Sequence, residues 1–188
     1  MRKSRRVLKR FLLYAIAFSV FSVCGPAGIV RADDNKEYLV KAAFIYNFVK
    51  FIEWPDGKAI SKQSSIDICV AGDTPMAKTA EVFKAASSAK LNLSLVQEKN
   101  AKNIASHCHI VFIGASEASR LDDILGGLKG QPVLTVSDID GFAARGGMIE
   151  FVASDNKIKF IVNTKPIDAA KLHADAGMLE SALKVIGR

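Results

Sequence analysis

The chain has 188 residues, of which 49% are hydrophobic and 24% are charged, a composition typical of one globular domain with a sizeable core. Its formal net charge of +7 arises within the first 32 residues, which hold seven Lys and Arg and no acid. The remainder has 19 basic and 19 acidic residues, which excludes attraction to nucleic acid or an anionic membrane through an excess of positive charge.

The first 32 residues predict a cleaved secretory signal peptide. A basic segment is followed by the apolar run Phe11–Val23 and then by small residues. This run is too short and ends too abruptly to span a membrane as a helix. We expect cleavage after Ala32, with cleavage after Ala27 as the alternative. Residues 33–188 then form one periplasmic domain.

The segment Lys36–Trp54 predicts a long helix that ends at Pro55. At 100° per residue its apolar side chains lie almost all round the helix instead of along one stripe. It must therefore be covered on more than one side, either as a core helix within its own fold or by another molecule as well. Six of the fifteen aromatic residues lie in this segment, and aromatic side chains are common anchors of interfaces.

Strands and helices alternate in the middle of the chain. Three segments predict strands: Ile66–Ala71, Leu91–Val96 and His109–Gly114. Helices are expected at Met76–Ala89 and Ser116–Leu128, and Lys99–Ser106 is expected to be a connection. Strand-helix-strand repeats of this kind give a parallel sheet with right-handed crossovers.

The stretch from Gln131 to Asn163 predicts three more strands in quick succession. They lie at Pro132–Val136, Met148–Ala153 and Lys157–Asn163. The turn signal Asp155-Asn156 joins the last two as a hairpin, and a two-part helix is expected from Ile167 to Ile186. We therefore predict an α/β protein, a Rossmann-like sandwich with a mostly parallel sheet of five or six strands, flanking helices and an antiparallel C-terminal hairpin.

Catalytic motifs are absent from the sequence, which has no Gly-x-Ser-x-Gly elbow, Walker loop, His-Glu-x-x-His motif or complete dinucleotide fingerprint. On one strand His107 and His109 would point away from Cys108, so the three side chains cannot converge on a metal without a bend. A paired-carboxylate hydrolase would need acids that face each other across a cleft. The acids nearest the hairpin are Asp138, Asp140 and Glu150. We expect no enzyme, no metal and no cofactor.

Export also decides how the cysteines are interpreted. Only Cys69 and Cys108 remain after removal of the signal peptide, and the compartment beyond the inner membrane is oxidising. One disulfide is the simplest arrangement, and in the chain-entropy model a loop of this length contributes roughly 3 to 4 kcal/mol. Two free thiols are the alternative.

Ordered blocks of sequence resemble a known family. They are Lys41–Pro55 (KAAFIYNFVKFIEWP), Ile68–Val70, Cys108–Ile113, Val133–Asp138, Gly141–Phe142, Gly146–Ile149 and Lys159–Asn163. These blocks closely resemble the YfiR family of periplasmic regulators, the YfiR/HmsC-like proteins. The resemblance covers essentially all of the chain after the signal peptide.

The resemblance implies a periplasmic repressor that binds the periplasmic sensor domain of an inner-membrane diguanylate cyclase of the YfiN type. Repression would keep cyclic di-GMP, and hence biofilm formation, low. It also implies a homodimer whose activity depends on disulfides and responds to reducing conditions. Cys69 and Cys108 match one family cysteine pair. Ala143 and Glu150 stand where some members have a second pair, so this chain lacks that bridge.

The expected partner-contact residues lie on and around the hairpin: Phe142, Ile149, Phe160, Ile161 and Ile167. Ile161 stands where an acidic residue is common in the family, which puts any polar contact there in doubt. The alternative function is a periplasmic small-molecule-binding sensor module. Its ligand would lie beyond the carboxyl ends of the strands, near Gly72 or Gly114.

Overall fold

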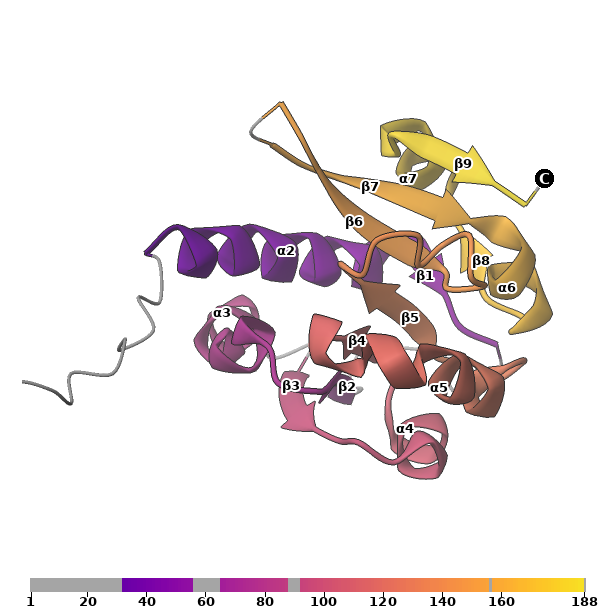
Figure 1. Cartoon of the computed structure of the whole chain (residues 1–188), viewed down its shortest axis with the longest axis horizontal. Helices are drawn as coiled ribbons and strands as arrows, with labels where there is room; N and C mark the ends of the chain where they lie inside the picture. The colour runs from indigo at the N-terminus through magenta and orange to yellow at the C-terminus, as the bar shows by residue number, and fades with distance from the viewer. Residues whose placement is uncertain (1–31, 56–64, 88–91, 156, 188) are drawn as a thin grey trace, which may run out of the picture. The chain divides into compact units, whose positions relative to one another are not determined.

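The computed structural model describes residues 32–55, 65–87, 92–155 and 157–187 (Figure 1). Residues 1–31 of the predicted signal peptide lie outside the described residues, and cleavage of the peptide stays a prediction. In chain order the elements are α2 (Ala32–Phe51), β1 (Ile52–Glu53), β2 (Ser65–Ala71), η1 (Pro75–Lys78), α3 (Ala80–Ala86), β3 (Asn92–Gln97), α4 (Ala101–His107), β4 (Ile110–Ile113), η2 (Ala115–Arg120), α5 (Leu121–Leu128), β5 (Leu134–Ser137), β6 (Ile149–Ser154), β7 (Lys157–Asn163), α6 (Thr164–Ala169), β8 (His173–Ala174), α7 (Ala176–Ser181) and β9 (Lys184–Ile186).

The main sheet has seven strands in the order β3-β2-β4-β5-β6-β7-β9. Strands β3, β2, β4, β5 and β6 are parallel, β7 is antiparallel to β6, and β9 is parallel to β7. Strands β1 and β8 form a separate antiparallel pair. The predicted mostly parallel α/β sandwich with an antiparallel hairpin is thus confirmed, although the main sheet has seven strands where five or six were expected.

The central strands are buried on both faces. Ile110 and Phe112 of β4 belong to the larger core, which includes α2, whereas Val111 and Ile113 belong to a second core with residues of α4 and α5. A strand covered on both faces has no polar side, so its sequence is a continuous apolar run. This is why the apolar runs in the sequence predicted β2 and β4 correctly.

Helix α2 supplies the centre of the larger core. Ile45 is fully buried and Phe48 is 2% exposed, and the Phe48 ring lies 6.0 Å from that of Phe151 and 5.2 Å from that of Phe160 between centroids. Burial of one such side chain contributes about 1.5–3 kcal/mol. The inner side of α2 therefore packs in the core against the hairpin β6–β7. This agrees with the interpretation of its sequence as a core helix.

The outer side of α2 is not covered by the described residues. Leu39, Val40 and Phe51 are 48%, 45% and 40% exposed. The helix ends at Phe51, before Pro55, because β1 turns aside to pair with β8. The all-round apolar character of the sequence thus has two parts, an inner core side and an outer apolar side.

Two segments differ from the prediction. Most of the expected connection Lys99–Ser106 belongs to α4, which is capped by the Asn100 side chain as it accepts a hydrogen bond from the Lys102 backbone N–H at 2.9 Å. The sequence did not predict this helix because Ile104 is its one buried residue, so it has no apolar stripe. This helix completes the crossover that two parallel strands require.

The expected helix Ile167–Ile186 is divided into α6, β8, α7 and β9. Helix α6 ends just before Lys171, which adopts a left-handed φ of 57°. Strand β9 then pairs with β7 and places Val185 beside Val162. Short apolar runs suit a helix or a strand equally, and the free edge of β7 decides between them here.

The loop between β5 and β6 packs tightly onto the second core through Phe142, which is fully buried. Gly147 lies against the Phe142 ring, and a Cβ at Gly147 would overlap three atoms of that ring. Because Phe142 is enclosed, its ring cannot swing aside into solvent.

We therefore expect Gly147→Ala to lower the free energy of unfolding by about 1–3 kcal/mol, the usual cost of overpacking. Gly126→Ala is the matched control, since a Cβ there meets nothing within 4 Å and Gly126 lies within α5. The control should raise stability by about 0.5–1 kcal/mol. Urea denaturation measures both changes. Equal stability of the two variants would show that the Phe142 packing is loose.

Candidate functional site

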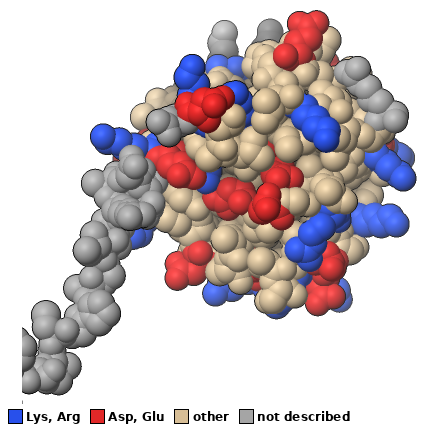
Figure 2. Space-filling view, turned by 45° about the horizontal axis from the view of Figure 1, so that its top comes forward, with Lys and Arg blue, Asp and Glu red and all other residues tan. Residues whose placement is uncertain are grey.

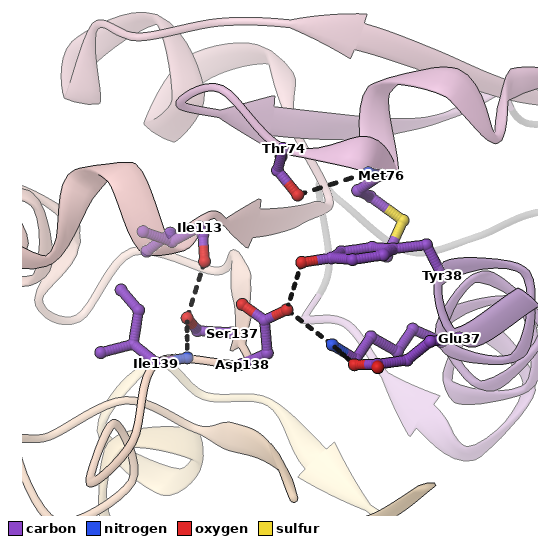
Figure 3. A network of polar contacts seen from close by, with 9 residues as sticks. Glu37, Tyr38, Thr74, Met76, Ile113, Ser137, Asp138 and Ile139 are labelled. Carbon is purple, nitrogen blue, oxygen red and sulfur yellow. Dashed lines mark hydrogen bonds and ion pairs between the residues drawn. The ribbon is translucent and has the colours of Figure 1, made fainter. Parts of the chain in front are cut away.

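A cluster of polar side chains joins α2 to the carboxyl end of β5 (Figure 3). Glu37 and Tyr38 precede Lys41 by four and three residues, so α2 presents both of them next to Lys41. Asp138 directly follows β5. Because ligands of open α/β sheets bind beyond the carboxyl ends of the parallel strands, this cluster is the candidate site.

Lys41 is the buried cation of the cluster, with a side chain only 4% exposed. Its Nζ lies 2.6 Å from Asp138 Oδ2 and 2.5 Å from Glu37 Oε1. Two carboxylates around one ammonium leave a formal charge of −1. The attraction between Lys41 and Asp138 holds α2 against the sheet, and loss of Lys41 would leave the Asp138 carboxylate buried without a cation, whereas loss of Asp138 would leave Lys41 paired with Glu37.

Tyr38 completes the contact between α2 and Asp138. Its hydroxyl donates to Asp138 Oδ2 at 2.7 Å, and its ring packs edge-on against Phe112. Burial raises the pKa of Tyr38 above its ordinary value, and the hydrogen bond to Asp138 and the negative charge of that carboxylate raise this pKa further. The phenol therefore stays protonated, and its stabilising effect is present below pH 10 and is lost only as the pH rises through the folded-state pKa.

The backbone around Asp138 is fixed by its neighbour Ser137, as Figure 3 shows. The Ser137 hydroxyl donates to the carbonyl of Ile113 at 2.6 Å and accepts from the N–H of Ile139 at 3.0 Å. Asp138 Oδ2 accepts two hydrogen bonds, whereas Asp138 Oδ1 is buried with no partner among the described residues. Buried carboxylate oxygens normally have a donor, so this oxygen has unused capacity.

A cavity of about 240 Å³ lies beside the cluster. Its polar wall consists of Glu37, Lys41 and Asp138. The rest of the lining is apolar: Ala115, Phe151, Val152, Ala153 and Ile158. The sequence placed a ligand near Gly72 or Gly114, and Ala115, which follows Gly114, is part of this lining.

The predicted disulfide between Cys69 and Cys108 is formed. It joins β2 to the residue that ends α4, over a Cα–Cα distance of 5.9 Å. Cys69 and Cys108 are 2% and 1% exposed and lie within the second core. The structure therefore supports the disulfide over the alternative of two free thiols.

The predicted contact residues lie mostly in the interior. Ile161 of β7 is half-buried, beside Glu150 of β6 and Lys184 of β9. The other four are buried at 0–5% exposure: Phe142, Ile149, Phe160 and Ile167. Contact with a partner through any of the five residues stays a prediction, and only Ile161 has part of its side chain accessible without a rearrangement.

Glu150 has a structural role that sequence reasoning missed. It is 4% exposed, and its carboxylate accepts hydrogen bonds from the backbone N–H groups of Gly141 at 3.0 Å and Ala143 at 2.8 Å. The Asn163 side chain also donates to the Ala143 carbonyl at 2.8 Å. The loop before β6 is thus held by hydrogen bonds at positions 143 and 150, where the resemblance places a second cysteine pair in some relatives. A lone acid within the apolar run Met148–Phe151 was the available signal.

No metal site is formed by the side chains in the described part of the chain, where no three His, Cys, Asp or Glu residues are grouped for one. Exposed His107 contacts Ser106, and the His109 ring lies 6.1 Å from that of Trp54. Asp138 and Glu150 are engaged with Lys41 and with backbone N–H groups, so the two acids do not form a hydrolytic pair.

Fold and site together define a Rossmann-like α/β domain with a buried disulfide, in which an ion-paired lysine ties the N-terminal helix to the sheet. The chain belongs to the YfiR/HmsC-like family, whose model matches residues 38–182. The resemblance noted in the sequence is thereby confirmed. No curated protein matches the chain in sequence.

Two solved structures are similar in fold. The ABC domain in complex with L-Trp from Streptococcus pneumonia is 14% identical, with a TM-score of 0.53 over 80% of this chain and 60% of that chain. A conserved domain protein from Vibrio cholerae O1 biovar eltor str. N16961 is 8% identical, with a TM-score of 0.49 over 79% and 60%. The chain thus spans about three-fifths of the length of each. At 14% identity the likeness to the ABC domain concerns the fold alone.

We expect Lys41→Met to lower the free energy of unfolding by about 3 kcal/mol, because the Asp138 carboxylate would remain buried without its cation. Adding Asp138→Asn should restore part of the loss. Lys36→Met is the control, since exposed Lys36 lies in the same helix, and it should change stability by at most about 0.5 kcal/mol. Denaturant unfolding of wild type, the Lys41→Met and Asp138→Asn single variants and their double variant measures the coupling, with Lys36→Met beside them. If Lys41→Met and Lys36→Met changed the free energy of unfolding equally, the ion pair would not be a structural constraint.

Proposed function

We propose that the chain is a periplasmic negative regulator that binds the periplasmic sensor domain of an inner-membrane diguanylate cyclase of the YfiN type. Binding would repress cyclic di-GMP synthesis and biofilm formation. Membership of the YfiR/HmsC-like family over residues 38–182 carries this proposal. The buried Cys69–Cys108 disulfide accords with an oxidising compartment, which a cleaved signal peptide at residues 1–32 would allow the chain to reach.

A regulator acts by contact, and the chemistry of the site supports contact over turnover. The Tyr38 hydroxyl donates to the Asp138 carboxylate, which also pairs with Lys41, and the raised pKa of Tyr38 makes this hydroxyl a poor nucleophile. Figure 2 shows acidic and basic side chains interspersed over one face, with uncharged surface between them. Such a surface suits a protein partner better than nucleic acid. No helix in the described part of the chain is long and apolar enough to cross a membrane.

The outer side of α2 is the surface that we propose for contact, together with Ile161 of β7. Val40 and Phe51 point in nearly the same direction, because eleven residues make about three helical turns. Leu39 widens the patch, and three of the five exposed large hydrophobic side chains among the described residues lie on this helix. Exposed apolar helix sides are common recognition surfaces. We also propose that the chain forms a homodimer.

A second candidate function is a small-molecule sensor module, which the cavity beside Lys41 favours. The ABC domain from Streptococcus pneumonia is described in complex with L-Trp, but it shares only the fold with this chain. Both functions can reside in one protein if ligand binding tunes repression.

We expect Val40→Glu to abolish co-purification of the full chain with the tagged periplasmic domain of its cyclase. A charge at the centre of an apolar contact would be buried without a partner. Val96→Glu is a closely matched control, since Val96 is 47% and Val40 is 45% exposed. Val96→Glu should bind as wild type. Equal capture of both variants would mean that α2 is not the contact, and gel filtration of each would show whether the same patch makes the homodimer.

We also expect the oxidised protein to bind the cyclase and the Cys69→Ser, Cys108→Ser double variant not to bind. Without the disulfide the two cysteines, 39 positions apart, are no longer linked in the unfolded chain. In the chain-entropy model this lowers the free energy of unfolding by roughly 3 to 4 kcal/mol. Binding is compared at matched folded concentration, and cyclic di-GMP is measured in cells with each form. Equal binding by both forms would remove redox control from the proposal.

A further inference from the structure

The cavity beside Lys41 has two chemically different walls. The hairpin β6–β7 contributes Phe151, Val152 and Ile158 to an apolar wall. Glu37 and Lys41 of α2 and Asp138 after β5 form the opposite, polar wall. A ligand that fits must have an apolar body and one polar end, as most small-molecule sites require.

The polar wall favours a cation. Glu37 and Asp138 carry two negative charges against the single positive charge of Lys41, and no other basic residue of the described segments lines the cavity. Lys159 of the hairpin instead contacts Ser154 and Asp155. An anionic ligand would meet a net negative wall, whereas an ammonium group would balance it.

One carboxylate of the polar wall has capacity for another donor. The Glu37 side chain is 41% exposed, so its carboxylate is open to solvent while it holds Lys41. Asp138 adds negative charge to this wall, but its Oδ2 already accepts from Tyr38 and Lys41 and its Oδ1 is closed to solvent. An ammonium group offers three N–H donors, and hydrogen bonds between an ammonium and a carboxylate are among the strongest in proteins.

The volume limits the ligand to a small molecule. About 240 Å³ is below the range of roughly 300–1,000 Å³ that is usual for drug-sized ligands. A nucleotide or a peptide does not fit such a space. A compact amine with one ring or a short alkyl chain does.

We propose that this cavity binds a small primary amine, with its ammonium group at the Glu37 carboxylate and its apolar body against Phe151, Val152 and Ile158. The ligand would join α2 to the hairpin β6–β7. The proposal names the ligand class of the sensor function above and does not depend on repression of a cyclase.

The test uses the purified mature chain with phenethylamine as the probe and 3-phenylpropionate, an anion with a similar apolar body, as the control ligand. Isothermal titration calorimetry and thermal shift should detect the amine and not the anion. Glu37→Gln should weaken amine binding about tenfold, the effect of one charge-assisted hydrogen bond. Ala115→Leu should abolish amine binding by filling the cavity, since Ala115 is exposed and lines it.

Glu180→Gln is the matched control for Glu37→Gln, because Glu180 is exposed on α7 and does not line the cavity. It should bind the amine as wild type does. Equal binding of amine and anion, wild-type binding by Ala115→Leu, or no binding of the amine at millimolar concentration would each overturn the proposal. Since the assay contains no cyclase, its failure would leave the capture experiments untouched, and their failure would leave this result standing.

Discussion

The ion pair between Lys41 and Asp138 is the constraint on which the rest of the structure depends. It joins residues 97 positions apart and fixes the N-terminal helix against the carboxyl end of the sheet. With α2 fixed there, its inner aromatic side chains meet the hairpin β6–β7, its outer apolar side is left exposed, and a cavity remains between helix and hairpin. One buried contact thus determines where each functional surface lies. Its cost of desolvation is offset because Tyr38 and Glu37 add further partners.

Two other devices hold the sheet, and they respond to different conditions. The Cys69–Cys108 disulfide is covalent and joins β2 to the segment between α4 and β4. Glu150 holds the loop before β6 through backbone N–H groups and contains no sulfur. A reducing agent can therefore act only on the first device among the described residues. Within the described residues, a redox response would therefore act at β2 and Cys108 and not at the loop near Phe142.

The sequence predicted what depends on local pattern. The apolar runs of β2 and β4, the alternation of β7 and the cysteine pair were all foreseen, because burial on one or both faces leaves a period in the sequence. Helix α4 and strand β9 were missed because their place is set by neighbours distant in sequence. The pairing of Lys41 with Asp138 was missed for the same reason. Apolar residues such as Ile149 and Phe160 were expected at an interface, since composition alone cannot separate a core position from a contact position.

Helix α2 bears on both candidate functions, because its outer side is the proposed contact and Glu37 and Lys41 line the cavity. A ligand changes the affinity for a partner only if it binds the two states of the protein differently. A ligand held between α2 and the hairpin β6–β7 would favour the state in which the helix is docked, and a partner that requires the docked helix would then bind more tightly. By linkage the partner must raise the affinity for the ligand by the same factor. If the partner instead required α2 to move outward, the same ligand would oppose it, so the sign of the coupling reports the position of α2 in the complex.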